Sequence, residues 1–188
     1  MLLPQITTIL GLASLSQAVN LRFYYSNNCS GNNVVCSNIA RNTCCNGNGI
    51  SVFFGLNRAV EGRVYDRGGC NRLRGVRTSV GSTSFCLRQG NDVMTGAQWR
   101  PPPSLRLAAV PEQPEACPAG GDKCESWARP DVLGLADGTE YEIGGVGGGP
   151  VRKNVRNSKR LALAADGSIS SAQDLPEEFK SLVVTTTE

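Results

Sequence analysis

Residues 19–100 alternate short runs of strand-forming residues with polar turns rich in glycine and asparagine. The runs LRFYY, GISVFFGL, GRVYD and VRTSVGSTSFCL are rich in β-branched and aromatic residues, and SNNCSGNN and RGGCN are typical of the turns. No helical repeat with capping residues interrupts this pattern. The sequence therefore predicts an all-β module over residues 19–100, built as a small disulfide-stapled sandwich.

The module contains an internal repeat with an offset of 41 residues (63 − 22). In that frame Arg22-Phe23-Tyr24 lies over Arg63-Val64-Tyr65, Cys29 over Cys70 and Cys45 over Cys86. No gap is needed between residues 22–45 and 63–86. The sequence therefore predicts two copies of one supersecondary unit.

A boundary is expected near residue 100, because Pro101-Pro102-Pro103 fits neither a helix nor a sheet. Residues 101–130 are predicted to be a proline-rich linker, in which Cys117 and Cys124 close a local loop. Within residues 131–150, Asp137-Gly138 between two strand-like runs predicts a β-hairpin that docks on the module, followed by a glycine-rich segment.

The two ends of the chain indicate export and processing. Residues 1–18 are apolar and uncharged and end in Ser16-Gln17-Ala18, which predicts a secretory signal cleaved after Ala18. Residues 151–188 are basic at first and then acidic and low in aromatic residues, which predicts a disordered tail. Its Lys159-Arg160 pair is either a processing site or two solvated basic residues.

Eight cysteines in a short exported chain predict a disulfide framework and an extracellular location. Six of them allow fifteen pairings, which stay open; Cys36 and Cys44 are the pair that the repeat leaves over, and we expect them to bridge each other. The chain has no histidine, which excludes His-based catalysis and His-ligated metal sites, so we expect neither metal nor cofactor. The cysteines are Cys29, Cys36, Cys44, Cys45, Cys70, Cys86, Cys117 and Cys124.

Charge is distributed unevenly along the chain. Residues 19–100 hold ten arginines and three acids, which gives 10 − 3 = +7, whereas residues 101–188 hold nine basic and thirteen acidic residues, which gives 9 − 13 = −4. Six clustered arginines form a candidate strip for binding anions or a partner, because guanidinium groups bind sulfate, phosphate and carboxylate in two-contact geometry. Their alternative role is to solvate one face of a sheet. These arginines are Arg58, Arg63, Arg67, Arg72, Arg74 and Arg77, of which Arg72, Arg74 and Arg77 are expected on one strand face.

Two further sets of polar residues bear on function. Glu61 and Asp66 are the module's only closely spaced acids, and we interpret them as surface charges paired with arginines rather than as a glycosidase pair. Asn28-Cys29-Ser30 is an N-glycosylation acceptor sequence whose use stays open, since its middle residue is expected in a disulfide.

The module resembles the βγ-crystallin-like family, whose domains are built from two Greek-key units of about forty residues. Tyr24-x4-Cys29-x-Gly31 resembles its folded-hairpin motif, with cysteine in place of the second aromatic residue. Tyr65-x4-Cys70 resembles a second copy in which Arg72 replaces the glycine. The resemblance implies that Ser51 and Ser84 pin the two hairpins. The stretches corresponding to the family's calcium sites, residues 46–51 and 79–84, contain no carboxylate, so no tight calcium site is expected.

The whole chain also resembles small cysteine-rich secreted proteins of filamentous fungi, through SNNCSG, NTCCNGNG and PDVLGLADGTEYEI. This resemblance implies a non-enzymatic interaction protein, effector-like or toxin-like, that binds an extracellular protein, an acidic glycan or a membrane surface. We expect a monomer that does not bind nucleic acid. A protease or hydrolase inhibitor presenting RPPPS or VYDRGG, a secreted hydrolase, and a structural protein of a cell wall or spore coat stay open as alternatives.

Overall fold

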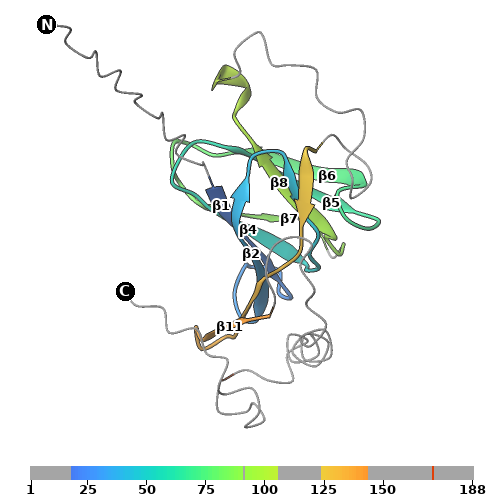
Figure 1. Ribbon diagram of the computed structural model, residues 1–188, viewed down its shortest axis with the longest axis vertical. Helices are drawn as coiled ribbons and strands as arrows, with labels where there is room; N and C mark the ends of the chain where they lie inside the picture. The colour runs from blue at the N-terminus through green and yellow to red at the C-terminus, as the bar shows by residue number, and fades with distance from the viewer. Residues whose placement is uncertain (1–17, 91, 106–123, 144–170, 172–188) are drawn as a thin grey trace, which may run out of the picture.

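The computed structural model describes residues 18–90, 92–105 and 124–143, together with Ser171 (Figure 1). These residues form β-strands, with a short 3-10 turn at Pro103–Leu105 as their only helical element, so the all-β prediction is confirmed. The strands are β1 (Ala18–Tyr24), β2 (Asn33–Ala40), β3 (Thr43–Cys45), β4 (Ser51–Gly55), β5 (Glu61–Asp66), β6 (Arg72–Thr78), β7 (Phe85–Arg88), β8 (Gly96–Arg100), β9 (Ser126–Ala128), β10 (Val132–Gly134) and β11 (Glu140–Glu142).

Several predicted features lie outside the described residues. They are the signal segment up to Gln17, Cys117, the glycine-rich segment after Ile143, and the tail that includes Lys159-Arg160. Ala18, the predicted cleavage residue, is the first residue of β1. Among the described residues, no helix has the length and apolar content needed to cross a membrane.

The strands form two sheets. Sheet A has six strands in the order β11-β10-β2-β1-β4-β7, and sheet B has five in the order β6-β5-β8-β3-β9. Each sheet combines strands from both halves of the module, the first half being β1 to β4 and the second β5 to β8. Sheet A takes β1, β2 and β4 from the first half and β7 from the second, whereas sheet B takes β5, β6 and β8 from the second half and β3 from the first. Neither half can therefore leave the fold without disrupting both sheets.

The core lies between the two sheets. Leu21 and Phe23 on β1 and Phe54 on β4 are fully buried, and Trp99 on β8 is fully buried from the opposite sheet. The Trp99 Nε1 group donates a hydrogen bond to the Ile39 carbonyl at 2.7 Å, which satisfies its one polar group inside the sandwich. Alternate residues of β1 face this core, as the period of a strand requires.

One disulfide crosses the core. Cys36 on β2 bonds to Cys45 on β3, so it joins sheet A to sheet B, and both residues are fully buried. The prediction that Cys36 pairs with Cys44 is wrong. Adjacent residues of a strand point to opposite faces, so Cys45 faces the core and Cys44 faces away from it.

Two disulfides fasten the long loop of each half to the third strand of the other half. Cys29, in the β1–β2 loop (residues 25–32), bonds to Cys86 on β7, and Cys70, in the β5–β6 loop (residues 67–71), bonds to Cys44 on β3. Since β7 and β3 are the strands that each half contributes to the other sheet, both bridges stabilise the interleaved arrangement. Cys124 is also disulfide-bonded, and its expected partner Cys117 lies outside the described residues.

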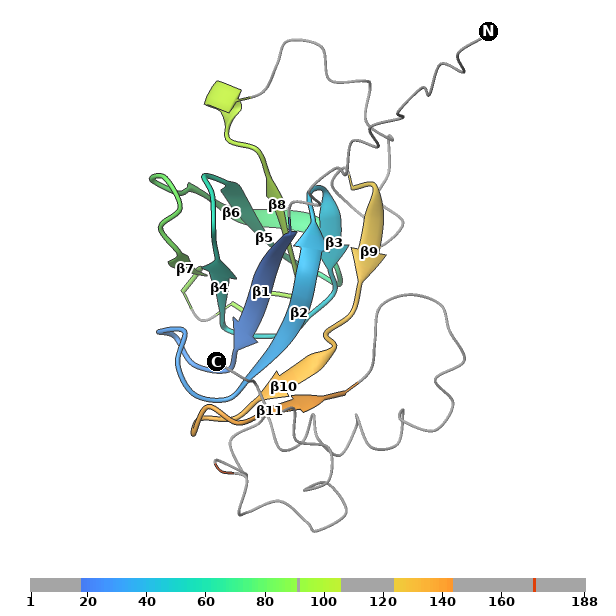
Figure 2. The ribbon, with the colours of Figure 1, turned by 60° about the vertical axis from the view of Figure 1, so that its left-hand side comes forward.

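Residues 124–143 extend both sheets. β9 pairs in parallel with β3, and Ser126–Ala128 are therefore sheet residues, contrary to the linker predicted over residues 101–130. The predicted hairpin forms from β10 and β11, with Gly138 in the left-handed region at φ 89°, and β10 pairs with β2. Figure 2 shows the chain passing from β9 beside β3 to β10 beside β2.

Candidate interaction site on the β6 edge

Five of the six arginines of the predicted strip lie on β6, on its partner strand β5 or in the loop between them. Among the described residues, β6 ends sheet B and pairs with β5 alone, and it is exposed along most of its length. Figure 1 shows β6 and β5 side by side at one margin of the sandwich. Arg72, Arg74 and Arg77 lie on β6, Arg67 in the β5–β6 loop, Arg63 on β5, and Arg58 between β4 and β5.

Two of these arginines are engaged in ion pairs at the loop end of β6. Arg72 binds Asp66 through two contacts, with Nε donating to Oδ1 at 2.7 Å and Nη2 to Oδ2 at 2.5 Å. The Nε atom of Arg74 lies 3.3 Å from Oδ2 of Asp66, and its Nη2 donates to Asp92. Asp66 and Asp92 therefore neutralise part of the strip and fix the direction of both side chains.

A β-bulge decides which arginines share a side of the edge. Tyr65 opposes Leu73 and Val64 opposes Gly75, so Arg74 has no residue opposite it. Asp66 opposes Arg72 and Gly62 opposes Arg77; since Asp66 and Gly62 face the same side of β5, so do Arg72 and Arg77. The prediction that Arg72, Arg74 and Arg77 share one face relied on simple alternation along the strand. The bulge interrupts that alternation, so Arg72 and Arg77 share a side and Arg74 is the extra residue.

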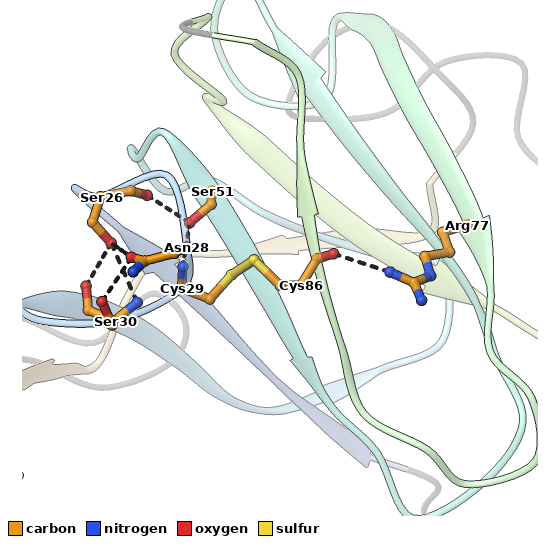
Figure 3. The surroundings of a disulfide bond; sticks show 7 residues. All are labelled: Ser26, Asn28, Cys29, Ser30, Ser51, Arg77 and Cys86. Atoms are coloured by element: carbon orange, nitrogen blue, oxygen red, sulfur yellow. Dashed lines mark hydrogen bonds between the residues drawn. A yellow bond between two sulfur atoms is a disulfide. The ribbon is translucent and has the colours of Figure 1, made fainter.

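Arg77 connects the margins of the two sheets. Its Nη1 donates to the Cys86 carbonyl at 3.3 Å, and its guanidinium carbon lies 5.1 Å from the centre of the Phe85 ring. Figure 3 shows Arg77 reaching the Cys86 carbonyl on one side of the Cys29–Cys86 disulfide. No carboxylate pairs with Arg77 within the part of the chain that the structure describes, so its positive charge is available to a ligand.

The remaining arginines differ in how free they are. Arg63 donates from Nε to Glu61 at 2.7 Å, whereas Arg58 donates only to the neutral side chain of Asn57 at 3.3 Å. Arg67 is exposed, at a left-handed φ of 63°. Six arginines against Glu61, Asp66 and Asp92 leave the strip with 6 − 3 = +3, and in the described ranges Arg58, Arg67 and Arg77 have no acidic partner.

The β5–β6 loop that presents Arg67 is pinned by Thr95. The Gly68 amide donates to Thr95 Oγ1 at 2.9 Å, and that hydroxyl donates to the Gly69 carbonyl at 3.2 Å. Ser84 instead accepts a hydrogen bond from the Leu56 amide, so the prediction that it pins this loop is wrong.

In the first half of the repeat, the predicted pinning serine is confirmed. Ser51 Oγ accepts from the Cys29 amide at 3.1 Å and donates to the Ser26 carbonyl at 2.7 Å. The hydroxyl therefore joins the two arms of the β1–β2 loop to the start of β4.

Exposed apolar side chains accompany the arginines on β6. Leu73 is 42% exposed and Val76 is 48% exposed. They lie opposite Tyr65 and Arg63, on the side of sheet B away from the core. Arginine beside exposed apolar side chains is a composition that partner-binding surfaces favour.

The carboxylates of the module do not form a pair suited to glycoside hydrolysis. Glu61 and Asp66 are five positions apart on β5, so they point to opposite faces of the strand. Each is bound by an arginine, as interpreted from the sequence. The interpretation of both as surface charges is wrong, because Glu61 is 5% exposed and Asp66 is 8% exposed. Within residues 18–90, 92–105 and 124–143, no three cysteine, aspartate or glutamate side chains gather as a metal site would require.

The pKa of Asp66 is lowered, chiefly because Arg72 hydrogen-bonds its carboxylate and further because Arg72, Arg74 and Arg67 are positively charged. A lowered folded-state pKa means that ionised Asp66 stabilises the fold at neutral pH, and that this stabilisation is lost as the pH falls through the folded-state pKa, below the ordinary value of about 3.9. We expect Asp66→Asn to lower the melting temperature at pH 7 and the difference from the wild type to shrink in acid. A difference that stays constant from pH 7 to pH 2 would contradict this coupling.

Comparison with known protein families gives a match to the ARB_05566_N family. Its model, described as an N-terminal domain, matches residues 20–131, which run from within β1 through β9 and so include every arginine of the strip. Neither a curated protein nor a solved structure matches the chain.

Proposed function

We propose that the chain, which belongs to the ARB_05566_N family of N-terminal domains, is a secreted, non-enzymatic interaction protein that binds an anionic partner through its β6 edge. The partner is an extracellular protein, an acidic glycan or a membrane surface, and the role is effector-like or toxin-like. The observation that carries the proposal is the exposed edge strand with three arginines, flanked by Arg67, which has no acidic partner among the described residues. Three disulfides in a small β domain are consistent with an extracellular location.

The interleaving of the strands supports a crystallin-like, two-Greek-key assignment of the module. In each sheet the order is second, first and fourth strands of one half, then the third strand of the other, which is the same arrangement twice. The Ser51 hydroxyl between the arms of the β1–β2 loop agrees with the folded hairpin that the resemblance implies.

The geometry divides the arginines into two functional groups. Arg72 and Arg74 stabilise the edge through Asp66 and Asp92, and their charge is therefore partly compensated. Arg67 and Arg77 lie beyond these pairs at the two ends of β6. The strand itself separates them widely, because the part of β6 from Arg72 to Arg77 alone spans five residue steps, or about 17 Å. An extended polyanion, or a charged surface, matches this spacing better than a single small anion does.

Inhibition of a protease is less well supported. A segment held in a protease site as an extended strand needs β-region backbone, whereas Arg67, Gly68 and Gly69 in VYDRGG all have positive φ values of 63°, 85° and 53°. In RPPPS, Arg100 and Pro102 are buried, and Pro103 begins a 3-10 turn.

Charge reversal at the two uncompensated arginines of the edge tests the proposal. At roughly 1 kcal/mol for each arginine near an anionic surface, Arg67→Glu with Arg77→Glu should weaken binding at least about 30-fold. The measurement is retention on a sulfated-polysaccharide matrix and co-sedimentation with phosphatidylserine vesicles, each over a salt series. The control is Arg41→Glu with Arg129→Glu, which makes the same change of charge at exposed positions away from β6.

The two pairs of variants separate the possible outcomes. Selective loss with the β6 variant supports the proposal, and loss on one probe only identifies the partner class. Equal weakening by both pairs would mean that overall charge, not the edge, governs binding. No salt-sensitive binding of the wild type to either probe would overturn the proposal, and the arginines would then serve to keep an open edge from pairing with other chains.

A further inference from the structure

The β1–β2 loop presents an exposed asparagine within an acceptor sequence for N-linked glycosylation. Asn28 and Ser30 are exposed, and Asn28-Cys29-Ser30 is the one Asn-x-Ser/Thr sequence in the chain. The loop is held by Ser51 and by the Cys29–Cys86 disulfide, so its outer residues keep a defined direction. Figure 3 shows Ser26, Asn28 and Ser30 gathered on the opposite side of the disulfide from Arg77.

The Ser30 hydroxyl group orients the Asn28 side chain. Ser30 Oγ donates to Asn28 Oδ1 at 2.7 Å. Ser26 Oγ lies 2.9 Å from the same oxygen, but its single proton makes the shorter bond, to the Ser30 carbonyl at 2.6 Å. No residue of the described chain accepts a hydrogen bond from Asn28 Nδ2, which is therefore left for modification.

The middle residue of the acceptor sequence limits when modification can occur. Cys29 has a left-handed φ of 54° and is bonded to Cys86 on β7. An enzyme that reads three successive residues needs a backbone that it can draw into its own site, and the closed loop denies it that freedom. The chain is accessible before the bond between Cys29 and Cys86 forms, because Cys86 lies 57 residues further along.

We infer that Asn28 carries an N-linked glycan, added before the Cys29–Cys86 disulfide closes. In the transfer, Nδ2 of Asn28 attacks the anomeric carbon of a lipid-pyrophosphate-linked oligosaccharide. The new N–C bond replaces the bond from that carbon to the phosphate oxygen, the lipid pyrophosphate leaves with the electron pair, and the amide proton passes to a base of the transferase. The inference rests on the exported state in the proposed function, and not on the binding edge.

The test is the intact mass of the full chain, expressed in a eukaryotic secretory host, before and after digestion with a peptide N-glycosidase. The wild type should carry added mass that the enzyme removes, leaving aspartate at position 28. Asn28→Gln and Ser30→Ala should each abolish the added mass. Ser26→Ala is the matched control, since it removes a serine hydroxyl of the same loop but keeps the acceptor sequence, and it should remain glycosylated.

Cys86→Ser tests the order of events, because it frees Cys29 without altering the acceptor sequence. Its occupancy, scored on medium and cell fractions together so that misfolding does not hide the product, should be at least that of the wild type. A wild-type chain that carries no added mass in either fraction would overturn the inference. Lower occupancy in Cys86→Ser than in the wild type would overturn the proposed order of events.

Retention on the anionic probes is measured separately. Failure of the glycosylation inference therefore leaves the proposed anion binding testable, and the reverse also holds.

Discussion

Replacing Cys29 and Cys86 together with alanine should lower the free energy of unfolding by about 4 kcal/mol, as the loop-closure relation gives for a crosslink of this span. The two residues are 57 positions apart, the largest separation among the described disulfides. Their bond restricts the unfolded chain most, so its removal increases the entropy of the unfolded state most. Since domains are stabilised by about 5–15 kcal/mol in total, the variant should be close to its folding limit at 37 °C.

The position of β7 adds a local effect to this global one. In the part of the chain that the structure describes, β7 ends sheet A and pairs with β4 alone, and Cys86 connects it to the β1–β2 loop. Without the bridge, we expect Phe85–Arg88 to exchange amide hydrogens faster than β4 does under native conditions. Arg77 on β6 donates a hydrogen bond to the Cys86 carbonyl, so the Arg77 side chain should also become less ordered when β7 does.

Cys44→Ala with Cys70→Ala is the matched comparison. That bridge also fastens a loop to the third strand of the other half, but spans 26 residues, and β3 is held on both sides by β8 and β9. It should cost less, roughly 3.5 kcal/mol, and leave β3 protected from exchange. Denaturant unfolding and hydrogen exchange of both double variants check the order; an equal or larger loss for Cys44 and Cys70 would show that loop length does not decide it.

The connectivity of these bridges explains where the sequence repeat was informative and where it was not. Cys29 and Cys70 are correctly matched, since both lie in the first loop of their halves and bond to the third strand of the other half. The same fixed offset matched Cys45 with Cys86, although Cys44 is the residue that plays the corresponding role. A shift of one position along a strand turns a side chain to the opposite face. An alignment of the sequence alone therefore cannot decide which of the adjacent residues Cys44 and Cys45 faces the core.

Ion pairs between distant residues could not all be predicted from the sequence, for a different reason. Asp66 and Arg72 lie on neighbouring strands, and the sequence predicts that Asp66 pairs with a nearby arginine without identifying which one. Asp92 reaches Arg74 only because a bulge and a long loop bring them together, which no local pattern encodes. Burial of Arg100 and Pro102 likewise depends on tertiary packing, although their run of prolines indicates a boundary.

The pinning residues differ because the second half of the repeat is longer. Tyr24 pairs with Ser51 across β1 and β4, and Tyr65 pairs with Gly96 across β5 and β8. The tyrosines are 41 positions apart and their partners 96 − 51 = 45, so the second half has four additional residues between its first and fourth strands. Ser84 could not occupy the place of Ser51, and glycine stands there instead, with Thr95 providing the hydroxyl one residue earlier.

Gly96→Ala should therefore be strongly destabilising, by about 3 kcal/mol or more, at the upper end of what overpacking costs. A Cβ atom at Gly96 would lie 2.3 Å from the Gly69 carbonyl oxygen and 2.9 Å from the Cys70 amide nitrogen. Both are backbone atoms of the β5–β6 loop, which the Cys44–Cys70 bond and Thr95 hold in place, so the loop cannot move aside without losing those contacts.

Gly55→Ala is the control, because it is the same substitution on β4 and its Cβ would meet no atom closer than 3.6 Å. It should change stability little, or raise it slightly by restricting the unfolded chain. Denaturant unfolding of both variants measures the difference. A second readout follows from the loop itself: if Gly96→Ala displaces it, Arg67 moves with it, and binding at the β6 edge should weaken even at temperatures where the variant is folded. Similar stability of the two alanine variants would mean that the β5–β6 loop yields, and that Thr95, rather than the absence of a side chain at position 96, fixes its position.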